Sequence, residues 1–335
     1  MVAAPPVVRR FEKVARGQCA PAAVGTGRGR DRGGGQDGQD GQNGQWTCLR
    51  SSDVLQLKQW LKELGLDADP RAHGPHCAAR DDACVLDSLS KRGVVGAKQL
   101  ARERLVPAAP ASWRTKPSTW LTTPEFGQVM RQYEAAFAEF EFLGATPIDF
   151  DKPIGSSCVW PRICRFTIAK AVSNGKTKIG FVFNEDDHTG EGSHWICAFL
   201  DIPRGVFYYI DSVANDMPKE IATLARRLGS EYKRLYGRAL TVHESKIPHQ
   251  RGDNQCGMYC LFFIITLLTE TATYKELTGK RIPDLAMADL RKVLFRAPTD
   301  RHPPKPSAAK RSKTRKRKRH SKRGRGKRVR TRRRG

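Results

Sequence analysis

The sequence predicts an α+β fold, in which a short central sheet of mixed, mostly antiparallel strands is flanked by helices and preceded by an N-terminal helical extension. Three observations lead to this prediction. Runs rich in β-branched and aromatic residues at 179–183, 194–202 and 206–211 are typical of strands. An amphipathic pattern over 218–236 predicts a surface helix. The nearly all-apolar run 256–269 predicts a buried helix.

Turn and capping residues define the remaining elements. Pro203–Gly205 predicts a hairpin turn between the second and third of these strands. Thr123 followed by Pro124 is typical of a helix start, and apolar residues continue at helical spacing as far as Phe140. Further elements are predicted at 53–64 (a helix with Gly65 at its C-cap), 240–245 (a strand) and 286–295 (a helix).

Charge and composition divide the chain into four segments. The formal net charge is +26, but residues 301–335 hold 19 of the 60 Lys and Arg residues and none of the 34 Asp and Glu residues. A block of like charge cannot collapse on itself. We therefore expect a disordered Gly/Gln/Asp-rich N-terminus (1–45), a partly helical extension (46–118), a folded domain (119–297) and a disordered basic tail (298–335).

The basic tail is expected to bind nucleic acid without sequence specificity. Its Lys and Arg residues are not interleaved with aromatic residues, so contacts with phosphates are expected rather than base stacking. A nuclear-localisation signal is an alternative explanation of the same charge. The residues expected to contact phosphates are Arg315, Lys316, Arg317, Lys318, Arg319, Arg332, Arg333 and Arg334.

Cysteine usage and hydropathy bear on the compartment. The nine cysteines form an odd set without a regular framework, which is typical of a reduced intracellular protein with free, catalytic or metal-bound thiols. The N-terminal residues do not resemble a secretory leader. The longest apolar run, 258–268, is shorter than the roughly 20 residues that cross a bilayer. We expect a soluble, monomeric, intracellular protein that does not contact membranes.

Cys256 is the candidate nucleophile. It follows the polar loop 253–255 and begins the predicted buried helix, where the positive end of the helix dipole favours a thiolate. Gly257 would leave space beside it for a substrate backbone. The alternative is that Cys256 is a small core residue, like Cys260 one helical turn later.

His194, Asp211 and Gln250 are the candidate partners of this cysteine. His194 opens one strand of the predicted hairpin and Asp211 ends the other, so the turn brings an imidazole and a carboxylate together. Gln250, six residues before Cys256, could donate a hydrogen bond to the oxyanion of a tetrahedral intermediate. The alternatives are a structural histidine, a turn-forming aspartate and a solvated loop glutamine.

Together these residues resemble a known family. His194-Trp, then Asp211, then Gln250-x5-Cys256-Gly is similar to the pattern of the ubiquitin-like-protease superfamily, which includes SUMO proteases and the adenovirus protease. The resemblance implies a papain-like or adenain-like cysteine protease fold that needs no metal and no organic cofactor. It implies that His194 takes the thiol proton, Cys256 attacks the scissile carbonyl, and Gln250 with the N–H of Cys256 holds the oxyanion.

A narrower resemblance concerns the proteases of large nucleocytoplasmic DNA viruses, such as that of African swine fever virus. It is carried by Trp120-Leu and by the segments 132–134 and 142–150. It implies an endopeptidase that matures capsid or core polyproteins by cutting after small residues such as Gly-Gly, in the host cytoplasm or nucleus or in the virion. Trp120, Trp195 and Gly257 are the residues expected to contact the substrate.

Two rival functions stay open. A deconjugating isopeptidase acting on SUMO or another ubiquitin-like modifier would use the same residues, although Thr122-Thr123 stand where SUMO proteases have Asn-Asp. A nucleic-acid-binding packaging protein with an inert protease-like domain is the other rival. It need not retain all four candidate catalytic residues, and their presence argues against it.

Two further groups of residues were weighed as metal ligands. His73, His76, Cys77 and Cys84 fit no standard zinc-finger spacing. The acidic loop 186–191, which holds Asp186, Asp187, His188 and Glu191, is more typical of a solvated loop than of a cation site. No metal is therefore expected.

Overall fold

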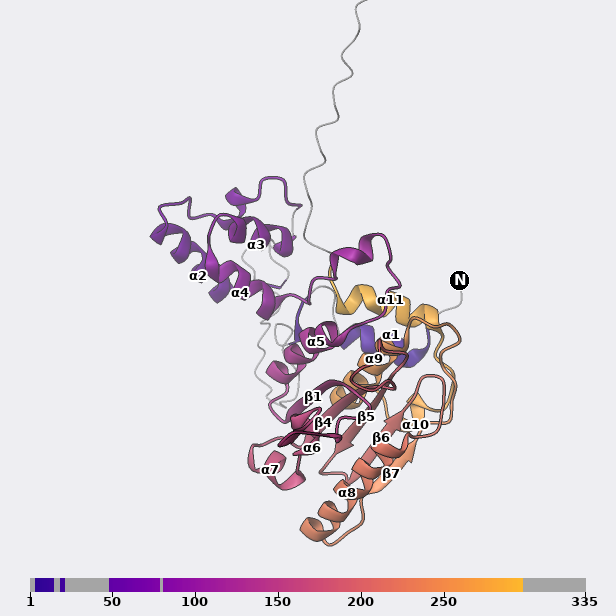
Figure 1. Ribbon diagram of the computed structural model, residues 1–335. Coiled ribbons are helices and arrows are strands. Elements are labelled where there is room, and N and C mark those ends of the chain that lie inside the picture. Colours follow the sequence, from indigo (N-terminus) through magenta and orange to yellow (C-terminus); the bar gives the residue numbers. More distant parts are fainter. Residues whose placement is uncertain (1–3, 15–18, 22–47, 79–80, 298–335) are drawn as a thin grey trace, which may run out of the picture. The chain divides into compact units, whose positions relative to one another are not determined.

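The computed structural model describes residues 4–14, 19–21, 48–78 and 81–297 (Figure 1). The predicted phosphate contacts at 315–319 and 332–334 lie outside the described residues. Helices of the described chain are α1 (Pro6–Val14), α2 (Ser51–Glu63), α3 (Asp82–Lys91), α4 (Val95–Arg104), α5 (Thr123–Ala136), α6 (Pro161–Cys164), α7 (Ile168–Ser173), α8 (Lys219–Tyr236), α9 (Cys256–Thr269), α10 (Tyr274–Leu277) and α11 (Asp284–Leu294), with the 3-10 turns η3 (Pro70–His73) and η4 (Ala111–Arg114).

A five-stranded mixed sheet forms the centre, in the order β1-β4-β5-β6-β7. The α+β class is therefore confirmed. The two central pairings, β4 with β5 and β5 with β6, are antiparallel as expected, but both outer pairings are parallel. The reason is that helices cross over between β1 and β4 and between β6 and β7, and such connections return the chain in the same direction. The strands are β1 (Phe140–Pro147), β4 (Lys178–Asn184), β5 (Trp195–Asp201), β6 (Val206–Ile210) and β7 (Thr241–Glu244), beside a small hairpin of β2 (Pro153–Ile154) and β3 (Ser157–Cys158).

Helices cover both faces of this sheet, with α9 on one face and α8 on the other (Figure 1). Successive residues of β5 divide between the two sides: Cys197 and Phe199 belong to the α9 cluster, whereas Ile196 and Ala198 belong to the α8 cluster. Because both faces are buried, the strand sequence reads as one continuous apolar run.

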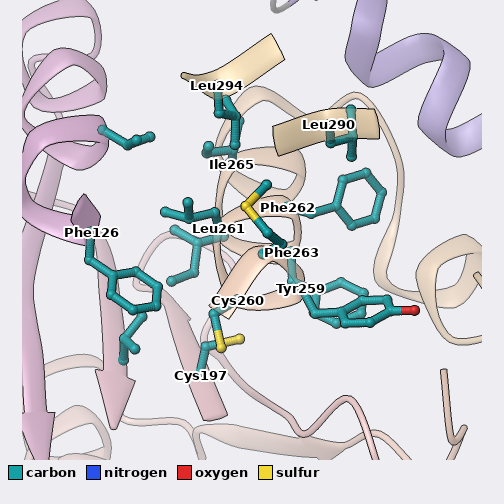
Figure 2. Close-up of a cluster of buried hydrophobic side chains, with 14 of the residues drawn as sticks. Phe126, Cys197, Tyr259, Cys260, Leu261, Phe262, Phe263, Ile265, Leu290 and Leu294 are labelled. Carbon is teal, nitrogen blue, oxygen red and sulfur yellow. The ribbon is translucent and has the colours of Figure 1, made fainter. Parts of the chain in front are cut away.

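Helix α9 is buried on every side, as its sequence predicts. Figure 2 shows its side chains Leu261 and Ile265 among Leu290 and Leu294 of α11. Burial of this kind holds the helix rigidly, so a group at its first residue is fixed in space. No helix in the described part of the chain has both the length and the apolar character needed to cross a bilayer.

The helix that begins at Thr123 is shorter than its apolar pattern. α5 ends at Ala136, Phe137 is extended (φ −125°, ψ 95°), and Phe140 begins the unpredicted strand β1. Phe137 and Phe140 are nevertheless buried in the same core as α5. The spacing of Phe137 and Phe140 is compatible with a helix and with an extended segment, and tertiary packing favours the extended segment.

The N-terminal segment expected to bury nothing contains helix α1. Its Val8 and Phe11 are fully buried, and the Phe11 ring packs 5.1 Å from the ring of Phe262 on α9. Arg10 Nε donates to the carbonyl of Thr271 at 2.7 Å. Apolar residues one turn apart give this short stretch a face that can pack, although the segment around it is polar.

Cysteine pairing differs from the expectation of free thiols. Disulfides join Cys19 to Cys48, Cys77 to Cys84 and Cys158 to Cys164. Sequence spacing gave no sign of these pairs, because their partners meet only through the fold. The cysteines that stay unpaired and buried are Cys197, Cys256 and Cys260.

Candidate active site

The candidate nucleophile lies where the sequence places it. Cys256 is the first residue of α9, and its residue is 1% exposed. Gly257 beside it is also buried, and a Cβ added there would lie 3.0 Å from the Cβ of Leu121. The space that we expected for a substrate backbone is therefore occupied by Leu121, and it is this side chain that requires a glycine at 257.

The candidate base and its orienter are in direct contact. His194 immediately precedes β5 and Asp211 immediately follows β6, and the antiparallel register that pairs Cys197 with Ile210 places these two ends together. His194 Nε2 lies 2.6 Å from Asp211 Oδ1.

Asp211 is fully buried and held by further donors. Its Oδ1 accepts the backbone N–H of Val213 at 3.0 Å, and its Oδ2 accepts that of Asn215 at 2.9 Å. A carboxylate fixed by several hydrogen bonds holds its partner imidazole in one orientation.

The pKa of His194 reflects these contacts. Burial lowers the pKa of the imidazole, but hydrogen bonds to Asp211 and to Cys256 outweigh burial and raise it from 6.5 to about 10. His194 therefore contacts Asp211 through Nε2 and interacts with Cys256 as well. These contacts favour the protonated imidazole, and an imidazolium beside a cysteine is the arrangement that activates a nucleophilic thiol.

Gln250 is tied to the segment that follows Asp211. Ser212 Oγ donates to Gln250 Oε1 at 2.9 Å, and the Gln250 backbone N–H donates to the carbonyl of Ser212 at 2.8 Å. Gln250 Nε2 donates one hydrogen to the carbonyl of Gly252 at 2.6 Å. An amide nitrogen carries two hydrogens, so the second is available to an oxyanion.

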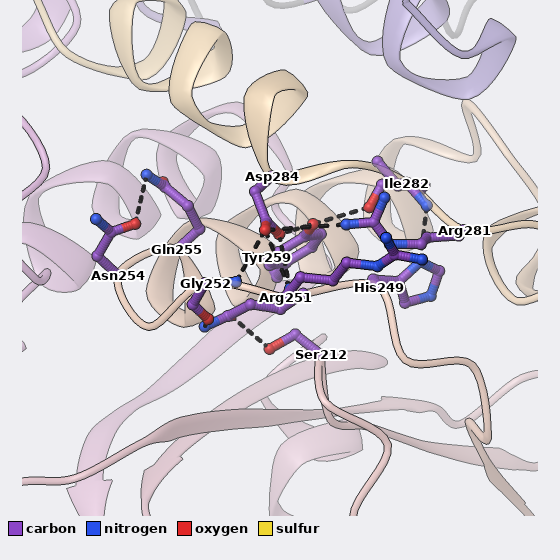
Figure 3. Close-up of polar contacts among 11 residues, drawn as sticks. Ser212, His249, Arg251, Gly252, Asn254, Gln255, Tyr259, Arg281, Ile282 and Asp284 are labelled. Atoms are coloured by element: carbon purple, nitrogen blue, oxygen red, sulfur yellow. Dashed lines mark hydrogen bonds and ion pairs between the residues drawn. The ribbon is translucent and has the colours of Figure 1, made fainter.

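The loop before Cys256 is held by the first residue of α11, Asp284 (Figure 3). The Asp284 carboxylate accepts the backbone N–H groups of Arg251 and Gly252, each at 3.0 Å, and the hydroxyl of Tyr259 at 2.8 Å. Two consecutive loop amides and the first turn of α9 therefore share one anchor.

A cleft of about 560 Å³ lies beside the His194 end of the hairpin, and Trp120 and Trp195 are among its lining residues. Trp195 is largely buried: its indole N–H donates to the carbonyl of Leu121 at 2.9 Å and its ring packs 5.0 Å from that of Phe126. It contributes one edge to the cleft and fixes Leu121, the neighbour of Trp120.

The acidic loop 186–191 forms part of the rim of this cleft. His188 and Asp186 of this loop are engaged within the protein, because His188 Nδ1 lies 2.6 Å from Asp149 Oδ2 and Ser193 Oγ donates to Asp186 Oδ1 at 2.5 Å. The loop therefore forms a rim held by hydrogen bonds and shapes the cleft from one side.

Of the residues weighed as metal ligands, one group in the described ranges lies close enough together to hold an ion. The ligand atoms of His76, Cys77 and Cys84 lie within 4.8 Å of one another. Here the two sulfur atoms are bonded to each other, and His73 is turned away, with its Nε2 2.8 Å from the carbonyl of Asp67.

Sequence reasoning missed Ser212, Asp284 and Arg291. Ser212 and Asp284 act through loop contacts that no local pattern marks. Arg291 did leave a signal, because it follows Leu290 and comes four residues after Met287 on the apolar side of its helix. A charged residue at such a position needs buried partners.

Sequence comparison relates the chain to known proteases. Residues 170–296 match the model of the Ulp1 protease family, C-terminal catalytic domain. A thiol protease of Acanthamoeba polyphaga mimivirus is 32% identical over 155 residues, which are 46% of this chain and 50% of that protein. The SUMO-1 cysteine protease of African swine fever virus (isolate Pig/Kenya/KEN-50/1950) is 31% identical over 135 residues, or 39% of this chain and 49% of that protein. The chain spans about half the length of each of these relatives.

A likeness in fold extends over a longer stretch of the chain. The crystal structure of the African swine fever virus protease superposes with a TM-score of 0.60 at 18% identity, covering 88% of this chain and 98% of that one. At this identity the match speaks for the fold alone. Residues 170–296 are thus similar in sequence to the catalytic domain of the Ulp1 protease family, and the chain shares the fold of the African swine fever virus protease.

Proposed function

We propose that the protein is a cysteine endopeptidase with Cys256 as nucleophile, His194 as its base and Asp211 as the orienter of that base. The observation that carries the proposal is the 2.6 Å contact between His194 Nε2 and the buried Asp211, made by an imidazole that also interacts with Cys256. This is the arrangement that an activated thiol requires.

The mechanism follows from these positions. The Cys256 thiolate attacks the scissile carbonyl, and the oxyanion is held by the second amide hydrogen of Gln250 and by the backbone N–H of Cys256. His194 gives its proton to the leaving amine, which departs and leaves a thioester on Cys256. Water then attacks the thioester while His194 takes its proton, and the acid product and the thiol are released.

The proposed substrates are viral structural polyproteins cut after small residues such as Gly-Gly. Support comes from the two indoles of Trp120 and Trp195 at the cleft and from Leu121, which fills the space next to Gly257. Large side chains at these places favour a substrate backbone without side chains of its own. The polyprotein as substrate rests on the resemblance to the proteases of large DNA viruses.

A second candidate function is removal of a ubiquitin-like modifier. Two relatives favour it by name: the SUMO-1 cysteine protease of African swine fever virus and NEDD8-specific protease 1 of Schizosaccharomyces pombe, the latter 24% identical over 117 residues. Cleavage rates on a SUMO fusion and on Gly-Gly-X peptides separate the two functions. An endopeptidase cuts both with similar kcat/KM, whereas a deconjugating enzyme prefers the folded modifier by orders of magnitude.

Labelling with a peptide vinyl sulfone ending in Gly-Gly tests the nucleophile. We expect the wild type to be labelled and Cys256→Ala to be unlabelled, because only a base-activated thiol reacts quickly. Cys260→Ala is the matched control, since Cys260 is a buried free thiol one turn further along α9, whose pKa is raised well above its ordinary value by burial and by Cys197. It should label like the wild type. Labelling that survives in Cys256→Ala would exclude Cys256 as the nucleophile.

We further propose that the tail binds nucleic acid through phosphates. The support is its charge, with 19 Lys and Arg residues in 301–335. Deleting 300–335 should abolish most binding to random-sequence duplex DNA, and the full chain should lose affinity steeply as salt rises. Fluorescence anisotropy at several salt concentrations measures both effects. Equal, salt-insensitive binding by the two proteins would contradict the proposal.

A further inference from the structure

We propose that Arg291 is a positioning residue of the reaction: it ties the segment that carries Trp120 to the loop that precedes Cys256, and it places a cation near the nucleophile. The inference rests on the proposed peptidase function. It adds a role for α11, which contributes none of the four candidate catalytic residues.

The geometry of Arg291 joins two segments far apart in sequence. Its Nη1 donates to the carbonyl of Thr119 at 2.6 Å, and its Nη2 donates to the carbonyl of Asn254 at 3.3 Å. Thr119 is bonded to Trp120, which lines the cleft, and Asn254 is two residues before Cys256. One guanidinium therefore spans from the cleft wall to the loop that enters α9.

Burying the cation of Arg291 costs free energy of folding, because the charge loses its hydration. Arg291 is 6% exposed, and among the described residues no carboxylate forms an ion pair with it. Its charge is compensated by two carbonyl oxygens and by the ring of Trp113, which lies 4.3 Å from the guanidinium carbon. The Nε hydrogen of Arg291 is buried without a partner. An apolar side chain would fill this place at lower cost if packing were the purpose.

The charge of Arg291 acts on the catalytic pair. Burial lowers the pKa of Arg291 to about 10, and interactions with Cys256 and with Glu125 oppose that effect, so the side chain is a cation at neutral pH. Among the described residues, the carboxylates of Asp211 and Glu185 interact with His194. Against these two carboxylates, Arg291 adds a positive charge to that of His194.

Two separate effects follow for the reaction. The contact with Asn254 fixes the direction of the chain as it enters α9, and so fixes the oxyanion N–H of Cys256. The contact with Thr119 fixes Trp120 and the cleft wall. Loss of the guanidinium fork should therefore affect both substrate binding and the chemical step, whereas loss of the charge should affect the formation of the thiolate.

Two variants separate the hydrogen bonds of the guanidinium from its positive charge: Arg291→Lys keeps the charge alone, and Arg291→Met removes both. With a Gly-Gly-X peptide, we expect kcat/KM to fall by about tenfold in Arg291→Lys and by about a hundredfold in Arg291→Met, with changes in both kcat and KM. The rate of Cys256 alkylation by iodoacetamide should keep its wild-type pH profile in the lysine variant. In the methionine variant the acid limb should move up by about one pH unit, because the cation beside the thiolate is gone.

Two controls distinguish this role from simple stability. Lys292→Met changes the next residue of α11, which is exposed. This variant should keep the wild-type kcat, KM and pH profile of alkylation. Arg296→Met removes a partly buried arginine that donates to the carbonyl of Val106 at 3.1 Å, away from the site. It should lower thermal stability without moving the alkylation profile. The proposal is overturned if Arg291→Met keeps the wild-type profile and loses no more activity than Arg296→Met.

Alkylation also keeps the two proposals distinguishable. If the wild type cleaves no peptide, the proposed function fails, and the alkylation profiles still report whether Arg291 acts on Cys256. If Arg291→Met does not fold, as judged by circular dichroism, Arg291→Lys decides. A lysine variant with wild-type kcat and KM would then exclude the positioning role.

Discussion

Replacing His194 with alanine should lower kcat/KM for a Gly-Gly-X peptide by about 10⁴- to 10⁶-fold at neutral pH. In the proposed mechanism the imidazole both stabilises the Cys256 thiolate and protonates the leaving amine, and no other described histidine or carboxylate is bonded to Asp211 in its place. Steady-state hydrolysis of a fluorogenic peptide measures the loss.

His243→Ala is the matched control for this experiment. His243 lies on the exposed strand β7, where its ring stacks 5.6 Å from that of Tyr208. It has no role in the proposed reaction. It should retain wild-type kcat/KM. If His194→Ala lost less than tenfold, another group would have to serve as the base, and the proposed mechanism would be wrong.

Replacing Asp211 with asparagine should move the alkaline limb of the pH profile. The pKa of His194 stands at about 10 in the wild type because hydrogen bonds to Asp211 and Cys256, and their charges, overcome burial. An asparagine keeps the shape and the hydrogen bond to the ring but removes the charge, so the pKa of His194 should fall back toward 6.5. Activity that needs the imidazolium is then lost at a lower pH, and the deficit should be largest above pH 7.

The measurement is kcat/KM between pH 5 and 10.5 for the wild type and Asp211→Asn. Asp216→Asn is the control, since Asp216 follows the same strand but is exposed and bonded to Lys246 at 2.6 Å. Its profile should match that of the wild type. An alkaline limb near pH 10 in both the wild type and Asp211→Asn would mean that the carboxylate does not set the pKa of His194.

The contact between His194 and Asp211 could be anticipated from sequence because it depends only on one hairpin. A short turn at Pro203–Gly205 joins two apolar runs, and pairing them brings their outer ends together whatever the rest of the chain does. Helix α9 was predictable for a similar reason, since its apolar run has no breaker within it. Both features depend on residues that are close in the sequence.

The support around the site depends on residues far apart in the sequence, and no local pattern shows it. Arg291 reaches Thr119 across 172 positions, and Ser212 reaches Gln250 across 38. Such pairs form only when α11 and the loops pack on the finished core. Strand β1 escaped prediction for another reason, because the spacing of Phe137 and Phe140 suits a helix as well as an extended segment.

Burial on both faces of the sheet has a consequence for catalytic accuracy. If β6 slipped by one residue against β5, Tyr209 would turn to the α9 side and Ile210 to the α8 side, and Asp211 would point away from His194. Each face is filled by side chains of fixed volume, so that slipped state would leave cavities on one side and clashes on the other. The hydrophobic packing of the two layers therefore fixes the register of β5 and β6. This register brings His194 and Asp211 to 2.6 Å from each other, although the packed side chains take no part in the contact.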